Sequence, residues 1–210
     1  MLEGVTWFRQ SSVRIRRGGV EIHIDPWGIP EESKADYILL THPHYDNFSE
    51  DDIARVRGPH TTLVAPASMR KQLEDVDHLM KPGDMVHLDG IEILGVPAYN
   101  EGKKFHPPEN EWLGYVFTVD GVTYYHSGDT DFLEAMNQIR CDVAFLPCHG
   151  HYTMGPEDTV HAAAACHARV VVPVHWGTHK ARANAERVKE LAKQQSSEGE
   201  VFILEQGMPS

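Results

Sequence analysis

The stretch THPHYDN, residues 41–47, decides how the rest of the chain is interpreted. It follows the apolar run YILL at residues 37–40, whose length and composition predict a buried strand. Alternate residues of an extended segment point the same way, so His42, His44 and Asp46 would project together from the end of that strand. Imidazole and carboxylate groups that converge in this way suit a divalent metal such as zinc. The competing interpretation is a loop with three solvated polar residues, and later motifs argue against it.

The bulk composition indicates a globular protein with a single domain that spans residues 1–210. Its apolar content of 41% and charged content of 24% are ordinary for this class. No stretch approaches the roughly 20 apolar residues of a membrane span, and the first 17 residues lack the apolar core of a secretory signal. The three cysteines, none of them in a CxxC pair, fit a reducing compartment. We therefore expect a cytoplasmic protein with no membrane partner.

The net charge of the chain indicates which classes of partner to expect. The formal net charge is −12, from 31 acidic and 19 basic residues. A broad nucleic-acid surface needs a positive patch, so no nucleic-acid partner is expected. A small-molecule substrate remains the expected partner, and the oligomeric state is not encoded in any pattern of the sequence.

Strand patterns alternate with helical patterns along the whole chain. Strands are predicted at residues 5–9, 13–16, 20–25, 37–41, 61–65, 85–88, 91–96, 113–119, 122–126, 142–147, 169–174 and 200–204. Helices are predicted after Ser49, around residues 69–73, after Asp131, and at residues 156–168 and 180–195. Such a pattern fits sheets covered by helices, in an α/β or α+β arrangement.

Two later motifs also stand at predicted strand ends. HSGDTD, residues 126–131, contains Asp129, and VHWGTH, residues 174–179, contains His175. Taken alone, Asp129 is also compatible with a helix N-cap, and His175 with a strand-end histidine that has no function. Their significance comes from their order in the chain after residues 41–47.

Residues 41–47 resemble the HxHxDH signature of the metallo-β-lactamase superfamily, and the THPHYD form resembles its small cytoplasmic hydrolases, including L-ascorbate-6-phosphate lactonase-like proteins. The resemblance implies an α+β fold, a four-layer αββα sandwich, and a metal-dependent hydrolase that uses metal-activated water. His42 and His44 would anchor a first ion, Asp129 would bridge two ions, and His175 would complete the second site. Asp46 would bind the second ion or, with one ion, orient and deprotonate the water. The expected cofactor is one or two divalent ions, zinc with manganese as the alternative.

Two departures from the family pattern stand at metal-binding positions. The last histidine of the signature is Asn47, and the third-motif histidine is replaced by Asn100. An amide oxygen is a weak, neutral ligand for zinc, but Asn47 is still a candidate metal ligand. These departures favour an alternative, a metal-binding or regulatory protein of the same fold with lost or weak catalysis.

The segment PCHGHYTM, residues 147–154, carries two histidines at the end of a predicted strand. We hypothesise that His149 or His151 replaces a missing metal ligand or, for His151, acts as a catalytic acid beside Asp46 and Asp129. The alternative places both at the rim or on the surface. His106 is a further candidate for the missing ligand.

Three other polar positions bear on the site. The resemblance implies that Asp25, at the end of a strand, supports the loop that carries the metal histidines. Lys103 and Lys104 would attract an anionic substrate, although solvated lysines are the simpler interpretation. By analogy with the lactonase-like branch, the resemblance implies a small, anionic ester, lactone or phosphodiester as the substrate. His23 is expected on the solvent face of its strand.

Overall fold

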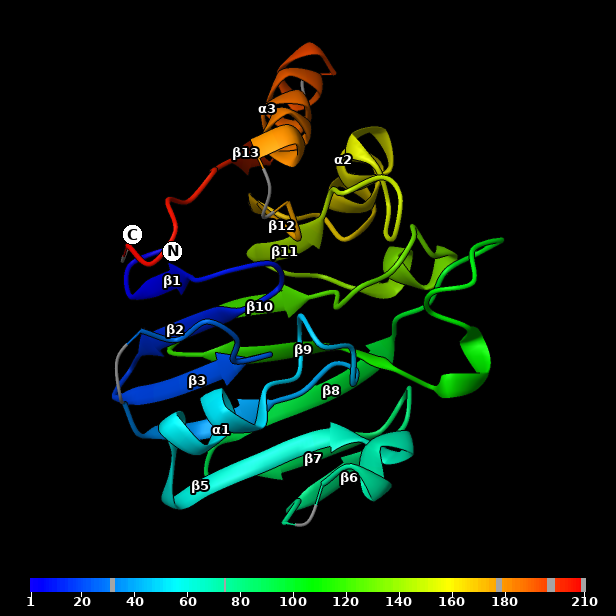
Figure 1. Ribbon diagram of the computed structural model, residues 1–210. Coiled ribbons are helices and arrows are strands. Elements are labelled where there is room, and N and C mark those ends of the chain that lie inside the picture. Colours follow the sequence, from blue (N-terminus) through cyan, green and yellow to red (C-terminus); the bar gives the residue numbers. More distant parts are fainter. Residues whose placement is uncertain (31–32, 74, 177–178, 196–198, 209–210) are drawn as a thin grey trace.

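The computed structural model describes residues 1–30, 33–73, 75–176, 179–195 and 199–208, and the side chains of residues 179–181 lie outside that description. The described chain forms two mixed β-sheets that face each other (Figure 1). Helices cover the outer sides of both sheets. The predicted α+β class and the four-layer αββα sandwich are confirmed.

The first sheet contains, in spatial order, β1 (Val5–Trp7), β2 (Val13–Arg17), β3 (Val20–Ile24), β4 (Ala35–Leu39), β5 (Arg57–Pro66) and β6 (His78–Met80). The strands from β1 to β3 are antiparallel neighbours, whereas those from β3 to β6 run parallel. The carboxyl ends of the parallel strands therefore meet at one edge of this sheet.

The second sheet contains, in spatial order, β13 (Glu200–Val201), β12 (Val170–Val174), β11 (Val143–Pro147), β10 (Val122–His126), β9 (Leu113–Val119), β8 (Ile91–Pro97) and β7 (Met85–Leu88). Strands β10 to β13 are parallel, and the hairpins β7–β8 and β9–β10 are antiparallel. These hairpins turn at Asp89 and Asp120, which have positive φ angles of 37° and 46° and precede glycines, as their Asp-Gly signals predict.

The helical elements are α1 (Glu50–Val56), α2 (Pro156–Ala165) and α3 (His179–Gln194), with 3₁₀ turns η1 (Ala67–Lys71), η2 (Pro108–Asn110) and η3 (Glu134–Gln138). Ser49 caps α1, because its hydroxyl accepts the Asp52 N–H. In α3, Ala185, Val188 and Ala192 are buried at helical spacing, as predicted, and α3 packs on α2 and β12. Ala181, expected on the same face, lies outside the described side chains.

Two hydrophobic clusters hold the layers together. The larger one fills the space between the sheets and continues under α2 and α3, and it includes Tyr115, Phe117 and Phe145. The smaller one lies between the first sheet and α1, around Ile38, with Leu40 among its members. No described helix is long and apolar enough to cross a membrane.

Several sequence expectations about elements were wrong in detail. The segment around residues 69–73 and the one after Asp131 are 3₁₀ turns, in which Gln72 and Ile139 N–H groups bond three residues back. Strand β6 was not predicted, because three residues are too few for a periodic pattern. The final strand is confined to residues 200–201, and α2 stops at residue 165.

His23 is also a correction. It is fully buried rather than on a solvent face, and its Nε2 lies 2.9 Å from the Glu21 carboxylate. The Phe8 ring stacks parallel to it at 6.3 Å. The face of β3 that carries His23 therefore belongs to the interior, and the polar partner Glu21 makes burial of the imidazole acceptable.

Candidate metal centre

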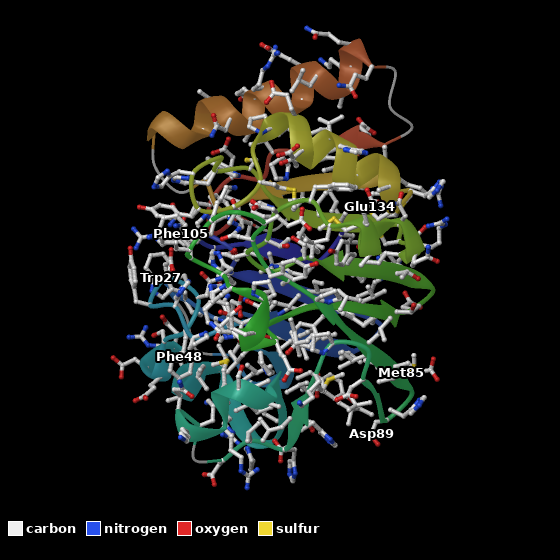
Figure 2. The ribbon with its side chains drawn as sticks, turned by 90° about the vertical axis from the view of Figure 1, so that its right-hand side faces the viewer. Trp27, Phe48, Met85, Asp89, Phe105 and Glu134 are labelled. Carbon is white, nitrogen blue, oxygen red and sulfur yellow. The ribbon has the colours of Figure 1, made fainter. Side chains whose placement is uncertain are left out.

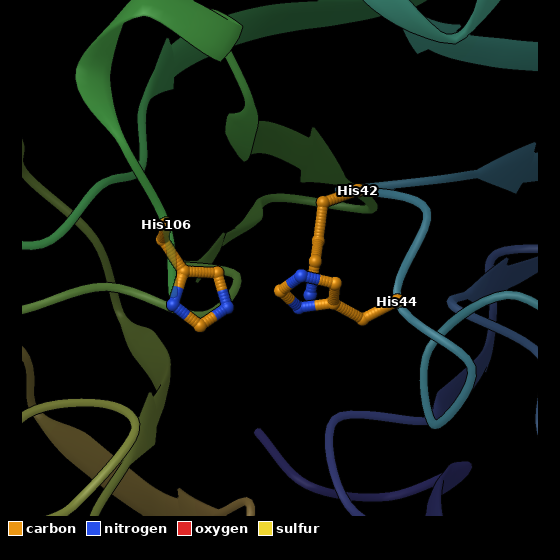
Figure 3. A group of neighbouring side chains, drawn as sticks. All are labelled: His42, His44 and His106. Carbon is orange, nitrogen blue, oxygen red and sulfur yellow. The ribbon is translucent and has the colours of Figure 1, made fainter. Parts of the chain in front are cut away.

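Three histidine side chains lie close together, as Figure 3 shows. One ring nitrogen from each of His42, His44 and His106 lies within 4.8 Å of the others. His42 and His44 follow β4, whereas His106 comes from the connection between β8 and β9. The indole of Trp112 packs against all three rings, with centroid distances of 4.9–5.6 Å. This indole fixes one side of the cluster.

Asp25 orients His42 through Thr41. The buried Asp25 carboxylate accepts the Thr41 N–H at 2.7 Å and the Thr41 hydroxyl at 2.5 Å. Because that hydroxyl proton is used, Thr41 Oγ1 accepts from His42 Nδ1 at 2.9 Å. The His42 Nε2 lone pair then faces the site, where it has no hydrogen-bond partner among described residues. The expected support of the loop by Asp25 is confirmed.

Asn100 orients His106 through a direct hydrogen bond. Its Oδ1 accepts both the His106 N–H at 3.1 Å and Nδ1–H at 2.8 Å. An amide oxygen cannot donate, so the proton is on Nδ1 and the lone pair is on Nε2. That Nε2 is buried and unpartnered within the described chain. The asparagine at the expected histidine position therefore positions a histidine six residues later.

Asp129 lies at the centre of the group, after β10. Its Oδ2 is 3.6 Å from Nε2 of His42, 3.6 Å from Nε2 of His106, and 3.0 Å from Nε2 of His175. Burial favours the neutral acid, but the nearby imidazoles of His175 and His42 outweigh it and hold the pKa of Asp129 well below its ordinary value. One carboxylate oxygen is thus shared by groups from both halves of the molecule.

Asp46 and His175 form a second pole beside Asp129. Asp46 Oδ2 is 3.5 Å from His175 Nε2 and accepts from Gln10 Nε2 at 3.2 Å. Although burial lowers it, the two carboxylates raise the pKa of His175 to about 10. By contrast, burial lowers the pKa of His42 to about 3. The two poles therefore differ, because the pKa is lowered at His42 and raised at His175.

The loop between β1 and β2 supports both carboxylates, which the sequence did not indicate. Ser11 donates its hydroxyl to Asp129 Oδ1 at 2.8 Å, and Gln10 contacts Asp46. His126 Nε2 lies 2.8 Å from the Ser11 carbonyl, while its Nδ1 accepts the Gly128 N–H. The loop is therefore tied to the end of β10. A serine and a glutamine in a hairpin loop form no recognisable motif, so no local signal reveals them.

The other candidate ligands lie outside the three-histidine cluster. Asn47 is buried and donates to Asp25, while its Oδ1 has no partner among described residues. The His149 ring lies 5.7 Å from the His175 ring, centroid to centroid. His151 is exposed and contacts the ring of Tyr152 at 4.6 Å. The structure brings His106 into the cluster, rather than His149 or His151.

Lys103 and Asp131 have different neighbours from those expected. Lys103 forms a salt bridge with Asp131 and donates to the Thr153 carbonyl at 2.9 Å. Asp131 also accepts the Glu101 N–H, so it anchors the loop between β8 and β9 instead of capping a helix. Lys104 is exposed.

A cavity of about 200 Å³ opens onto these groups. It is lined by His44, Tyr45, Asp46, Phe105, His106, Asp129, Tyr152 and His175. Buried imidazoles with unpartnered Nε2 atoms, next to carboxylates, form the nitrogen and oxygen donor set that zinc and similar divalent ions prefer. The residues present therefore fit a divalent metal.

Comparison with known proteins agrees with this geometry. Residues 4–175 match the model of the β-lactamase superfamily domain. A UPF0173 metal-dependent hydrolase of Thermococcus onnurineus is 32% identical over 209 residues, covering 90% of this chain and 91% of that protein. A relative with the same description from Ligilactobacillus salivarius is 30% identical, covering 83% and 85% of the two chains.

Solved structures share the fold. A crystal structure described as that of a metal-dependent hydrolase from Parabacteroides distasonis has a TM-score of 0.86 at 29% identity, covering 96% of this chain and 92% of that one. Igni18, a metallo hydrolase from Ignicoccus hospitalis, has a TM-score of 0.80 at 26% identity, covering 97% and 95%. The likeness to L-ascorbate-6-phosphate lactonases stays a prediction. The chain belongs to the UPF0173 metal-dependent hydrolases of the metallo-β-lactamase superfamily.

Proposed function

We propose that this hydrolase cleaves a small ester, lactone or phosphodiester with water activated by one or two divalent metal ions, zinc or manganese. The observation that carries the proposal is the position of Asp129, whose Oδ2 lies within 3.6 Å of three imidazole nitrogens from separate parts of the fold. A carboxylate in that position is suited to bridging two ions, which a neutral imidazole cannot do.

The residues divide into two sets of ligands. His42, His44 and His106 would hold the first ion through nitrogen atoms, and Asp129 faces both sets. Asp46 and His175 would hold the second ion, with the Oδ1 of Asn47, which has no partner among the described residues, and the imidazole of His149 as the proposed completing ligands. A divalent ion supplies Lewis acidity and lowers the pKa of water toward about 7.

Two side chains are proposed to transfer protons during hydrolysis. Asp46 lines the cavity, and its pKa is lowered because hydrogen bonds from His175 and Gln10 outweigh the effect of burial. In the proposed mechanism Asp46 orients water and accepts its proton when it is not needed as a ligand. His151, exposed near the mouth, exchanges protons with solvent and donates one to the leaving group.

The structure gives both asparagines at expected histidine positions a supporting role, so they do not favour the alternative of a protein with lost catalysis. Asn100 holds His106 in the cluster, and Asn47 donates to Asp25, which supports Thr41. The expectation of an anionic substrate came from the likeness to the lactonase-like branch, with Lys103 and Lys104 as possible sources of positive charge, and Lys103 is paired with Asp131. The proposal therefore retains the classes of bond that are hydrolysed but assigns no substrate-binding role to Lys103.

The test combines metal content with hydrolysis. Protein purified without chelator or histidine tag should carry one or two divalent ions per chain by elemental mass spectrometry. Panels of chromogenic esters and phosphodiesters, and of lactones, should reveal an activity that Asp129→Ala lowers on the order of 100-fold. The control is Asp51→Ala, on the exposed first turn of α1. Equal rates for Asp129→Ala and the parent would refute the assignment.

A further inference from the structure

Three exposed aromatic side chains from different segments surround the mouth of the cavity. Tyr45 comes from the loop after β4, Phe105 precedes His106, and Tyr152 follows β11. Their exposed fractions are 82%, 37% and 41%. Figure 2 shows Phe105 at the outer edge of the molecule. Large exposed aromatic groups that line one cavity are a feature of binding sites rather than of ordinary surfaces.

Ring contacts order part of this aromatic mouth. Phe105 and Tyr152 meet edge to face at 4.8 Å, and His151 lies 5.4 Å from the former and 4.6 Å from the latter, centroid to centroid. His149 adds a contact to Tyr152 at 4.9 Å. Such contacts restrict the rings before a ligand arrives, which reduces the entropy lost on binding.

Apart from the metal ions proposed to bind there, the side chains around the cavity offer little attraction to an anionic ligand. Its described lining contains Asp46 and Asp129 but neither lysine nor arginine. Lys103, two residues before Phe105, points to Asp131 and the Thr153 carbonyl instead. Phosphate groups are usually bound by arginine, lysine or several N–H donors, and the described lining contains neither lysine nor arginine for this purpose.

We propose that Tyr45, Phe105 and Tyr152 bind a flat apolar group of the substrate, so that the enzyme prefers carbonyl esters or lactones carrying an aromatic or unsaturated substituent. This inference rests on the proposed function, because the hydrolysed bond must reach the groups around Asp129. The cavity of about 200 Å³ is large enough. An apolar cavity of about 150 Å³ already accommodates benzene, which leaves space here for the reacting group beside one ring.

The experiment compares acetohydroxamate with benzohydroxamate, which share a metal-chelating head and differ by a phenyl ring. Each is titrated into cobalt(II)-loaded protein, and binding is measured from the visible cobalt spectrum. The parent should bind benzohydroxamate about threefold to tenfold more tightly than acetohydroxamate, which is the range expected for favourable aromatic contacts. Phe105→Ala and Tyr152→Ala should each remove most of that preference while leaving the acetohydroxamate affinity unchanged.

Phe202→Ala is the matched control, because Phe202 is 36% exposed and is not among the residues lining the cavity. A parent preference near one, an equal loss in Phe202→Ala, or tighter binding of methylphosphonate than of benzohydroxamate would overturn the inference. The phenyl preference persisting in a protein that hydrolyses no ester or lactone would contradict only the proposed function. Hydrolysis without the preference would contradict only the aromatic site, and failure of both hydroxamates to bind would contradict both.

Discussion

At the residue scale, neutral side chains set the direction of the metal-facing groups. Asn100 gives His106 its tautomer by accepting from Nδ1, and this leaves Nε2 unpartnered. Substituting Asn100→Ala should weaken metal binding about 10- to 100-fold, because partners that orient ligands contribute this much. Asn100→Asp retains an acceptor oxygen and should stay close to the parent. Competition with a chromophoric chelator measures both, and an unaltered affinity in Asn100→Ala would contradict the role.

Ser11 acts on Asp129 in a similar way. Its hydroxyl donates to Oδ1, whereas the imidazoles approach the other carboxylate oxygen, Oδ2. Ser11→Ala should lower metal affinity by about 10-fold or more, since the carboxylate loses the bond that orients it. Ser12→Ala is the matched control, because Ser12 is equally buried but accepts from Trp27 N–H. Similar metal dissociation constants for the two variants would remove Ser11 from the site.

The sequence identified the residues whose neighbours in the chain form a pattern. His42, Asp46, Asp129 and His175 each stand in a strand-end motif, and the structure brings all four together. His106 was named only as a further candidate, because its place depends on the fold of a long loop. Ser11 was missed, since its contact with Asp129 spans 118 positions and leaves no local trace.

At the element scale, β9 and β10 approach too closely for a side chain at one position. A Cβ on Gly114 would lie 2.7 Å from the His126 carbonyl oxygen and 2.8 Å from that of Ser127. Gly114→Ala should therefore lower the free energy of unfolding by about 1–3 kcal/mol, as overpacking does. Urea denaturation measures this. Gly58→Ala, whose Cβ would lie 3.4 Å from the flexible Lys34 side chain, should change stability little, and equal losses would contradict the explanation.

Elements with a strong period or turn signal were predicted well. The hairpins at Asp89 and Asp120 follow directly from Asp-Gly, and α1 follows from its Ser49 cap. The short elements η1 and β6 were not predicted correctly, because they contain too few residues for periodicity to distinguish a turn, a helix or a strand. Burial of His23 was missed because a polar residue in an alternating strand ordinarily marks the solvent side, and its partner Glu21 reverses that rule.

At the scale of the whole molecule, the metal centre joins the two sheets. His42 follows β4 of the first sheet, whereas Asp129 and His175 follow β10 and β12 of the second. Metal bound there would hold the sheets together and would stabilise the folded chain, because the unfolded chain does not present this site. At a free metal concentration 100 times the dissociation constant, the gain is about 2.7 kcal/mol. For a chain of this size, that corresponds to a rise of about 5–11 °C in Tm.

Differential scanning calorimetry of chelator-stripped protein, with and without added zinc, tests this expectation. His106→Ala removes one nitrogen of the three-histidine cluster and should lose most of the rise. His87→Ala is the control, because His87 is exposed on β7 and pairs only with Glu92 in the described ion pairs. The same Tm with and without zinc in the parent would mean that metal does not bridge the sheets.

The order of these groups along the chain also sets a timetable for biosynthesis. The three histidines, with Asp25 and Trp112 that support them, are all synthesised by residue 112, whereas His175 is added 63 residues later. At about 5–20 residues per second, the ribosome needs roughly 3–13 s for that interval. The three-histidine cluster can thus form in a nascent chain before His175, which pairs with the carboxylates of Asp46 and Asp129, has been synthesised. Metal acquisition during translation would begin at the histidines and end when β12 leaves the ribosome.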